Sequence, residues 1–369
     1  MENRVIRIAQ IVGKWVGGGV ESVIMNYYRN IDRTKIQFDF ICDEDSTCIP
    51  YEEIEKLGGR VIIIPPYQHQ IKYQIELNKV LKKNKYKIIH SHINTLSIFP
   101  LFAAKRAGVP IRIAHSHSTT NKKEWKRNLL KQILRPLSKI YATDYFCCSE
   151  FAGRWQFGNK AYDKGRVYLM NNAIEIDKFV FNENIRDKVR RELNISKDTL
   201  VIGHIGRFVE TKNHSFLLDV FKNIEAKKND TILLLLGQGP LEEKMKEKAK
   251  ELNIESKVKF LGQKKDVEKY YQAFDLFLLP SLYEGLGMTL IEAEISGLDC
   301  IVSDKVPKEA EIVDNKVKFL SLENKDAWVQ NCLKIKISDR KINLDKIRQY
   351  DIKNKVKELE DFYTKKWRS

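Results

Sequence analysis

Short apolar runs alternate with longer stretches in which apolar residues recur at every third or fourth position. The runs are rich in valine, isoleucine and leucine, whereas the longer stretches have the spacing of helices with one buried face. Strands are predicted at 5–12, 38–42, 60–65, 86–92, 111–118, 145–149, 200–208, 231–236, 258–263, 276–281 and 299–304. Strands that are apolar along their whole length and are separated by helices predict parallel sheets with both faces covered.

The alternation stops once, in the middle of the chain. A helical pattern at 121–144, interrupted at Pro136, is followed by a loop-like segment at 159–179, after which strands and helices alternate again. A chain of 369 residues is also too long for one ordinary hydrophobic core. We therefore predict two Rossmann-like α/β domains, 1–172 and 173–345, followed by a C-terminal helix within 346–369.

The charge of the chain narrows the class of partner. Lysine and arginine together number 65, against 49 aspartate and glutamate residues, which gives a net charge of +16. This balance favours an anionic partner, namely a nucleic acid, an acidic membrane or a phosphorylated ligand.

Cysteine usage and hydropathy indicate the compartment. The six cysteines form no paired framework, so we expect reduced thiols in a cytoplasmic protein. The first residues lack the apolar stretch of a signal peptide, and no apolar run reaches the roughly 20 residues of a membrane-spanning helix. We expect a protein that is soluble or peripheral on a membrane.

The residues with chemical potential cluster where predicted strands end. They lie at 17–21, 90–92, 115–117, 206–212, 237–240 and 283–287. In open parallel sheets, ligands bind outside the carboxyl ends of the strands. If two such sheets face each other, all of these loops line one cleft.

Two of these loops are suited to phosphate. Arg207 and Lys212 follow a strand and precede a helix, and a guanidinium fork with an ammonium group there can bind a diphosphate. Gly18 and Gly19 follow the first strand and allow close approach of backbone to an anion at the next helix. A solvated basic loop and a flexible turn are the plainer interpretations, and "GQGP" at 237–240 indicates only a tight turn.

Two carboxylates flank a third glycine loop. Glu284 precedes "GLG", and Glu292 lies in the second turn of the helix that follows. Each carboxylate can accept hydrogen bonds from a pair of sugar hydroxyls. The alternatives are an acid that merely stabilises a helix amino end and a glycosidase acid–nucleophile pair.

Histidines and an acidic triplet raise the question of a metal. His90 and His92 end one strand, and His115 and His117 end the next, with each pair on one face of its strand. A zinc site is conceivable, but no cysteine or carboxylate accompanies the pairs, so we expect at least one ring to act as a hydrogen-bond donor to a ligand. The triplet "DED" at 43–45 fits a divalent-metal motif and is interpreted here as a solvated loop.

Taken together, these motifs resemble the retaining glycosyltransferases of the GT-B fold in the large family four. The segment 284–292 is similar to the family's E-x₇-E signature, Arg207 and Lys212 to its phosphate-binding "GR…K", and "GGGVE" to its N-terminal glycine loop. The resemblance covers essentially the whole chain. Segments such as "IAHSHSTT" and "SGLDCIVSD" look most like the enzymes that build bacterial capsule and exopolysaccharide.

The resemblance implies an activity and roles for the matching residues. The enzyme would transfer a hexose from a nucleotide sugar, with UDP favoured, to a lipid-linked or growing glycan. Arg207 and Lys212 would neutralise the donor diphosphate, so that neither a metal nor a cofactor is expected. His117 matches the family's Ala-x-x-His pattern and would touch the donor sugar. The C-terminal helix would cross back to the first domain.

The expected catalytic residues are His117, Arg207, Lys212 and Glu284. The expected donor-binding residues are Gly18, Gly19, Gly206, Gly237, Gly239, Gly285, Leu286, Gly287, Met288 and Glu292. His115 and His92 are the alternatives and acceptor-side candidates.

The same resemblance gives the excess positive charge a place. The basic and amphipathic stretch at 122–141 is suited to an anionic membrane surface, where a lipid-linked acceptor would lie, although a core helix with a solvated basic face fits the pattern too.

Two rival functions stay open: a GT-B sugar-nucleotide epimerase and a nucleic-acid-binding protein. No known nucleic-acid reader motif is present, so no nucleic-acid partner is expected.

Overall fold

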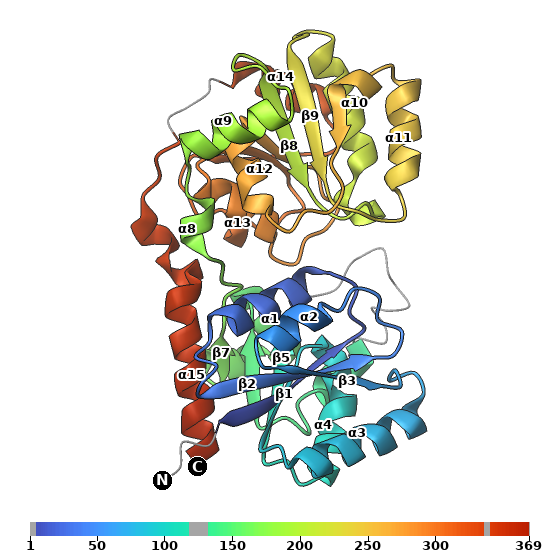
Figure 1. The fold of residues 1–369 in the computed structure, drawn as a ribbon, viewed down its shortest axis with the longest axis vertical. Helices are drawn as coiled ribbons and strands as arrows, with labels where there is room; N and C mark the ends of the chain where they lie inside the picture. Colours follow the sequence, from blue (N-terminus) through green and yellow to red (C-terminus); the bar gives the residue numbers. More distant parts are fainter. Residues whose placement is uncertain (1–4, 118–131, 336–339, 369) are drawn as a thin grey trace. The chain divides into compact units, whose positions relative to one another are not determined.

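The computed structural model describes residues 5–117, 132–335 and 340–368. The chain divides into two compact units, one made of 1–175 and 349–369, the other of 176–348. Each unit is built around its own parallel sheet (Figure 1). Both sheets are open and parallel, as the GT-B prediction requires.

The N-terminal unit contains a seven-stranded sheet in the order β3-β2-β1-β4-β5-β6-β7. Its strands are β1 (Ile6–Gly13), β2 (Ile36–Asp43), β3 (Arg60–Ile64), β4 (Ile88–Ser91), β5 (Ile111–Ser116), β6 (Asp144–Cys147) and β7 (Val167–Leu169). Its helices are α1 (Gly19–Asn30), α2 (Tyr51–Lys56), α3 (Gln70–Asn84), α4 (Ile98–Arg106), α6 (Glu150–Phe157), α7 (Asn159–Asp163) and α15 (Ile352–Arg368), with a 3-10 turn η1 (Asn94–Ser97).

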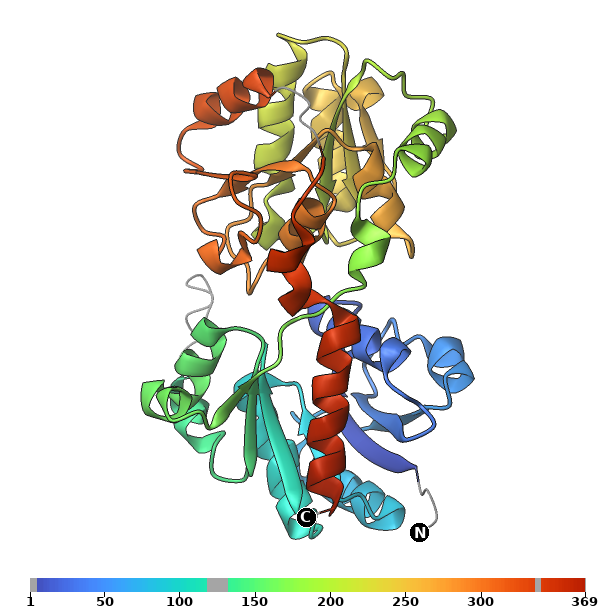
Figure 2. The ribbon, with the colours of Figure 1, turned by 90° about the vertical axis from the view of Figure 1, so that its left-hand side faces the viewer.

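Successive side chains along a strand point to opposite faces of the sheet, and in this unit each face carries its own hydrophobic core. On β1, Ile8 belongs to the core beneath α1 and α15, whereas Ala9 belongs to the core beneath α3 and α4. The buried residues of α15 form one stripe at helical spacing: Ile352, Val356, Leu359 and Tyr363. Figure 2 shows α15 lying along the strands of the N-terminal unit, so the last helix completes the core that the first strand begins.

The C-terminal unit contains a six-stranded sheet in the order β10-β9-β8-β11-β12-β13. Its strands are β8 (Leu200–Ile205), β9 (Thr231–Leu236), β10 (Val258–Phe260), β11 (Leu276–Leu279), β12 (Asp299–Ser303) and β13 (Val317–Leu320). Its helices are α8 (Ile176–Phe179), α9 (Glu183–Glu192), α10 (His214–Glu225), α11 (Glu242–Glu251), α12 (Val267–Ala273), α13 (Met288–Ile295) and α14 (Lys325–Lys334). The 3-10 turns are η2 (Glu210–Lys212), η3 (Glu255–Lys257), η4 (Lys308–Ala310) and η5 (Leu344–Tyr350), of which the last spans the boundary between the units.

The middle of the chain is more ordered than its sequence suggested. The segment 159–179, predicted to be a loop, contains α7, the edge strand β7 and α8, so that prediction was wrong. Residues 121–131 of the predicted helix at 121–144 lie outside the described residues, and its predicted end was wrong because Asp144 begins β6. Within the described part, residues 132–137 are helical, and Pro136 lies inside that helical stretch.

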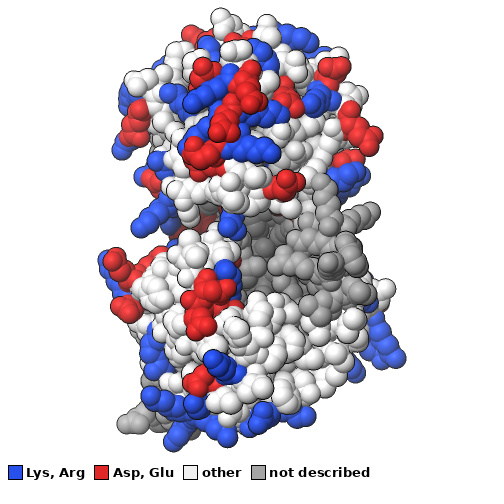
Figure 3. All heavy atoms as spheres, turned by 90° about the vertical axis from the view of Figure 1, so that its right-hand side faces the viewer, with Lys and Arg blue, Asp and Glu red and all other residues white. Residues whose placement is uncertain are grey.

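The surface charge is mixed where it can be seen. On the face in Figure 3, acidic and basic side chains intermingle over the C-terminal unit, while lysine and arginine predominate along the lower rim of the N-terminal unit. Among the described residues, no helix combines the length and apolarity needed to span a bilayer.

Candidate active site

The loops after β8 and β11 bring a lysine and a glutamate into contact. The Lys212 ammonium lies 2.7 Å from Glu284 Oε1, and both side chains are largely buried, at 19% and 9% exposed. The Ser281 hydroxyl donates a second hydrogen bond to the same oxygen, at 2.6 Å. Because β8 and β11 are neighbours in the sheet, residues 72 apart in sequence meet at its carboxyl edge.

Arg207 differs from Lys212 in its surroundings. Its side chain is exposed, and its guanidinium has no hydrogen-bond or ion-pair partner among the described residues. The loop after β8 therefore presents one cation held by a carboxylate and one that is free to bind an anion.

Gly237 and Gly239 allow the loop after β9 to lie directly on this basic loop. A Cβ atom at position 237 would lie 2.2 Å from the carbonyl oxygen of Gly206, and one at 239 would lie 2.4 Å from that of Phe208. A hydrogen bond from the Phe208 amide to the Gln238 carbonyl, at 3.1 Å, joins the two loops. The "GQG" turn, which the sequence alone showed only as a turn, is thus part of the support of Arg207 and Lys212.

The glycine loop at 285–287 leads into α13. Gly287 is the N-cap residue, with φ of +82°, a backbone conformation that favours glycine, and no side chain among the described residues caps the helix. Leu286 is buried and anchors the loop, and Met288 is the first residue of the helix. Unpaired amides at a helix amino end are suited to an anionic or polar ligand.

Glu292 lies one turn further along α13 and is held by a residue that sequence analysis did not identify. The hydroxyl of Tyr271, on α12, donates to Glu292 Oε2 at 2.8 Å. Burial raises the pKa of Glu292 to about 7, although the Tyr271 hydroxyl and the charge of Lys212 both lower it. The carboxylate is therefore poised to change its charge near neutral pH. No local pattern marked Tyr271, because it reaches the site from a separate helix.

In the N-terminal unit, Gly18 is the N-cap residue of α1 in an extended conformation, and Gly19 begins the helix. A Cβ atom at Gly18 would lie 3.0 Å from the Glu21 carboxylate, whereas one at Gly19 would meet nothing within 4 Å. Glu21 accepts a hydrogen bond from the Val16 amide at 3.0 Å and so holds the loop closed on itself. The loop is therefore crowded at Gly18 and has open space beside Gly19.

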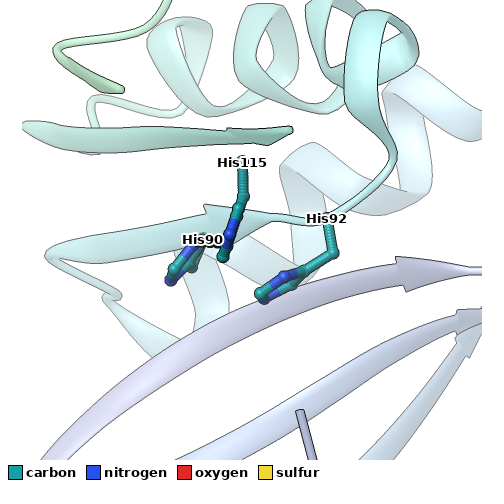
Figure 4. A group of neighbouring side chains, drawn as sticks. All are labelled: His90, His92 and His115. Carbon is teal, nitrogen blue, oxygen red and sulfur yellow. Dashed lines mark hydrogen bonds between the residues drawn. The ribbon is translucent and has the colours of Figure 1, made fainter. Parts of the chain in front are cut away.

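The four strand-end histidines form one buried group. His90 and His115 are joined by a hydrogen bond of 3.0 Å between ring nitrogens, and His92 and His117 by one of 2.9 Å. Figure 4 shows the rings of His90, His92 and His115 on one side of β4 and β5. Burial keeps the pKa of all four imidazoles well below its usual range, to about 3 for His117, so each ring is neutral.

Three of these histidines lie close enough together to be considered as metal ligands. One nitrogen each from His90, His92 and His115 lies within 4.8 Å of the others. Both nitrogens of His90 and both of His92 already take part in hydrogen bonds within the protein. The rings of His90 and His92 stack, with their centroids 4.3 Å apart. The arrangement favours a hydrogen-bonded network.

The acidic triplet at 43–45 is only partly the solvated loop that the sequence predicted. Asp45 is exposed and pairs with Lys14 at 2.8 Å. Asp43 ends β2 with only 4% of its surface exposed, and burial raises its pKa to about 7. For Asp43 the prediction was therefore wrong.

Comparison with known proteins places the chain in a family. Residues 185–353 match the glycosyl transferases of group 1, and residues 17–178 match glycosyltransferase family 4. EpsF of Bacillus subtilis (strain 168), whose name also assigns it to the glycosyltransferases, is 36% identical over 330 residues, covering 88% of this chain and 86% of EpsF. The chain belongs to the group 1 and family 4 glycosyltransferases.

Two further likenesses extend over the whole glycosyltransferase. A protein of Escherichia coli named UDP-Gal:alpha-D-GlcNAc-diphosphoundecaprenol alpha-1,3-galactosyltransferase is 23% identical, covering 97% of this chain and 96% of its own. The crystal structure of HepE from Anabaena in complex with UDP-glucose superposes with a TM-score of 0.77 at 15% identity, covering 98% of this chain and 100% of HepE. The second likeness confirms the fold, two Rossmann-like domains with parallel sheets. The names of these relatives give no support to the epimerase or nucleic-acid interpretations.

The structure groups the predicted residues of this glycosyltransferase by unit. In the C-terminal unit, the loops after β8, β9 and β11 carry Gly206, Arg207, Lys212, Gly237, Gly239, Glu284, Gly285, Leu286 and Gly287, and α13 adds Met288 and Glu292. The N-terminal unit carries Gly18, Gly19, His92, His115 and His117. Sequence analysis missed three residues that hydrogen-bond to this group: Gln10 to His92, Tyr271 to Glu292 and Ser281 to Glu284. It also missed Tyr363, which contacts His90 and Gln10.

Proposed function

We propose that this glycosyltransferase is a retaining hexosyltransferase that moves a sugar from a UDP-sugar to a lipid-linked or growing glycan in capsule or exopolysaccharide synthesis. The observation that carries the proposal is the contact between Lys212 and Glu284, at 2.7 Å. Lys212 lies on the loop after β8, which also presents the guanidinium of Arg207, unpaired among the described residues. The UDP-glucose complex of HepE supports the choice of donor. The undecaprenyl diphosphate in the name of the Escherichia coli relative supports a lipid-linked acceptor.

The residues divide the work by the charge that each carries. Arg207 and Lys212 would bind the donor diphosphate and stabilise the charge that develops as it leaves. Glu284 and the amides at 285–287 would hold the donor hexose, with Leu286 and Met288 fixing the loop. Glu292, held by Tyr271, would accept hydrogen bonds from the ribose hydroxyls.

Retention would follow from attack on the face that the diphosphate leaves. The bond from the sugar C1 to the phosphate oxygen breaks, and a bond from C1 to the acceptor oxygen forms on the same face. The acceptor's hydroxyl proton passes to the departing phosphate oxygen, and UDP is released. This course needs no carboxylate nucleophile. Because two cations already face the diphosphate, it is proposed to need no metal either.

The N-terminal unit would contribute the histidines and the contact with the membrane. His117 would contact the donor sugar. His115 and His92 are the alternatives and the candidates for contact with the acceptor. The basic stretch at 122–141 would bind an anionic membrane on its cytoplasmic face, but residues 122–131 lie outside the described part of the structure. Charge attraction of this kind weakens with salt, so vesicle binding at low and high ionic strength tests it separately.

The first test compares two lysines of the C-terminal unit. Lys212→Met removes a proposed diphosphate ligand, whereas Lys248→Met removes a lysine of similar exposure that pairs with Asp219 at 2.6 Å. We expect UDP to raise the melting temperature of wild type and Lys248→Met but not of Lys212→Met, since a ligand that binds only the folded state stabilises it by mass action.

Transfer assays complete that test. Wild type is assayed with a panel of UDP-, GDP- and ADP-sugars and a prenyl-diphosphate-linked sugar acceptor, with Mg²⁺ or with EDTA. We expect transfer from a UDP-sugar that EDTA leaves unchanged, and proton NMR should show the product's anomeric configuration to be that of the donor. Inversion, or a strict requirement for Mg²⁺, would contradict the mechanism. A response of Lys212→Met to UDP equal to that of wild type would contradict the site.

A further inference from the structure

The buried amide of Gln10, on β1, connects the two histidine pairs. Its oxygen lies 2.7 Å from His92 Nε2, and its nitrogen donates to the Tyr363 hydroxyl at 3.3 Å. The Tyr363 hydroxyl in turn lies 2.6 Å from His90 Nδ1. One side chain therefore ends two hydrogen-bonded chains, one that runs to His117 and one that runs to His115.

A neutral imidazole has one nitrogen that donates and one that accepts, so each chain has a direction. Because the Gln10 oxygen can only accept, His92 Nε2 carries the proton and His92 Nδ1 accepts. His117 Nε2 must then donate to His92 Nδ1, at 2.9 Å. This leaves a lone pair on His117 Nδ1, which is buried and, like His115 Nε2, has no hydrogen-bond partner among the described residues.

The second chain is directed in the same way. The Gln10 amide nitrogen donates to the Tyr363 oxygen, so the Tyr363 hydroxyl is available to donate to His90 Nδ1. His90 Nε2 then donates to His115 Nδ1 at 3.0 Å. The proton of His115 is left on Nε2, which is buried and lacks a partner among the described residues. All four histidines thus carry their proton on Nε2.

We propose that Gln10 and His92 are positioning residues that hold His117 as a hydrogen-bond acceptor, through Nδ1, for a hydroxyl of the substrate. The inference rests on the proposed function, which places His117 against the donor sugar. A lone pair at that nitrogen accepts from a hydroxyl but repels a carboxylate or phosphate oxygen. His117 therefore favours a neutral hexose over a uronic acid at the position that it touches.

Two features of the structure keep this arrangement fixed. All four histidine residues are buried, with exposed fractions of 0% for His90 and His115, 4% for His92 and 6% for His117. Water therefore does not compete for the hydrogen bonds between the rings. The opposite arrangement, with every proton on Nδ1, requires the Gln10 amide to turn over and all the hydrogen bonds of both chains to reverse together. A change in the orientation of the Gln10 amide therefore changes which nitrogen carries the proton in His117 and His115.

The test reads the protonated nitrogen directly. Long-range ¹⁵N–¹H NMR of histidine-labelled protein distinguishes Nδ1–H from Nε2–H, and it does so without any activity measurement. In wild type we expect the Nε2–H form for His90, His92, His115 and His117. Finding His117 protonated on Nδ1 would overturn the proposal with no variant needed.

Three variants separate the chains. Gln10→Met should release both and shift the spectra of all four histidines toward a mixture of forms. Tyr363→Phe cuts only the second chain, so His90 and His115 should change while His92 and His117 keep the Nε2–H form. Gln156→Met is the matched control, because Gln156 is fully buried in the same unit but neither of its side-chain polar atoms has a partner among the described residues. It should leave all four spectra unchanged. An unaltered His117 spectrum in Gln10→Met would contradict the proposal.

Activity gives the second readout. Gln10→Met should lower kcat/KM for the neutral UDP-hexose by about tenfold, the effect of one misdirected buried hydrogen bond, with little change in the affinity for UDP. Gln156→Met should not. If the tautomers are as assigned but Gln10→Met transfers at the wild-type rate, the positioning role is wrong while the proposed function stands. If wild type transfers no sugar, the proposed function fails, and the substrate part of this inference fails with it.

Discussion

The Glu292 carboxyl group changes between its charged and neutral forms near neutral pH. Burial raises its pKa to about 7, and the hydrogen bond from Tyr271 and the charge of Lys212 moderate the rise. The ionised form accepts hydrogen bonds from two hydroxyls, whereas the protonated form must give up part of this capacity. Its function as a ribose ligand should therefore depend on pH in the physiological range.

We predict that UDP loses its advantage over 2′-deoxy-UDP as the pH falls through 7. The ratio of the two affinities should drop by up to about tenfold between pH 8 and pH 6, because the ionised fraction of a group with a pKa of 7 falls by that factor. Isothermal titration calorimetry with both nucleotides measures the ratio, in which the ionisation of the phosphates cancels. Glu292→Gln should give a ratio that does not vary with pH. A pH-dependent ratio in that variant would assign the effect to another group.

Single residues were predictable where the chain itself brings them together. Glu284 and Glu292 flank one loop, and Arg207 and Lys212 share another, so their spacing showed them. Tyr271 and Gln10 could not be found in this way. Each acts through a hydrogen bond to a residue 21 or 82 positions away, on a different element. Nothing in their own neighbourhoods distinguishes them from ordinary buried polar residues.

At the scale of elements, the site depends on two loops whose backbones touch. We predict that Gly237→Ala disrupts this contact, because its Cβ would lie 2.2 Å from the Gly206 carbonyl oxygen. The variant should be destabilised by about 1–3 kcal/mol, as for other overpacked sites, and should bind UDP more weakly. Chemical denaturation and calorimetry measure the two effects.

Gly262→Ala is the control for that variant. Gly262 also has a positive φ, of +68°, but a Cβ there would meet nothing within 4 Å. It should show only the strain of the left-handed conformation, roughly 1–2 kcal/mol, with unchanged affinity for UDP. Equal losses of affinity in the two variants would show that loop contact does not matter to the site.

Elements were predictable from sequence in proportion to their length and the strength of their pattern. The central strands, such as β8 and β9, are mostly apolar and fully or almost fully buried, and they were predicted near their observed bounds. The edge strands β7 and β13 have three and four residues and no buried run, so they were not recognised. Helices α9 and α14 were also missed. In α9 the buried positions include an arginine, Arg190, which pairs with Asp275, so an apolar pattern could not reveal it.

At the scale of the whole molecule, the N-terminal unit is made from two distant parts of the chain. Helix α15 packs its apolar stripe on the core beneath α1. We predict that truncation after Asp351 leaves the C-terminal unit folded but exposes the core of the N-terminal unit. Limited proteolysis should then cleave residues 5–175 and spare 176–348. A synthetic peptide of residues 349–369 should restore protection, and failure of the truncation to loosen the N-terminal unit would show that α15 is dispensable.

The same discontinuity sets an order of events during biosynthesis. The ribosome finishes the C-terminal unit, residues 176–348, before it has made α15, although the N-terminal unit was begun first. Domains generally fold as units while synthesis proceeds at about 5–20 residues per second. Until α15 is made, the part of the N-terminal core on which it packs therefore stays uncovered. Tyr363, on α15, is made after the whole C-terminal unit, and it supplies the hydroxyl that His90 contacts. The histidine network is consequently completed only after both sheets have been synthesised.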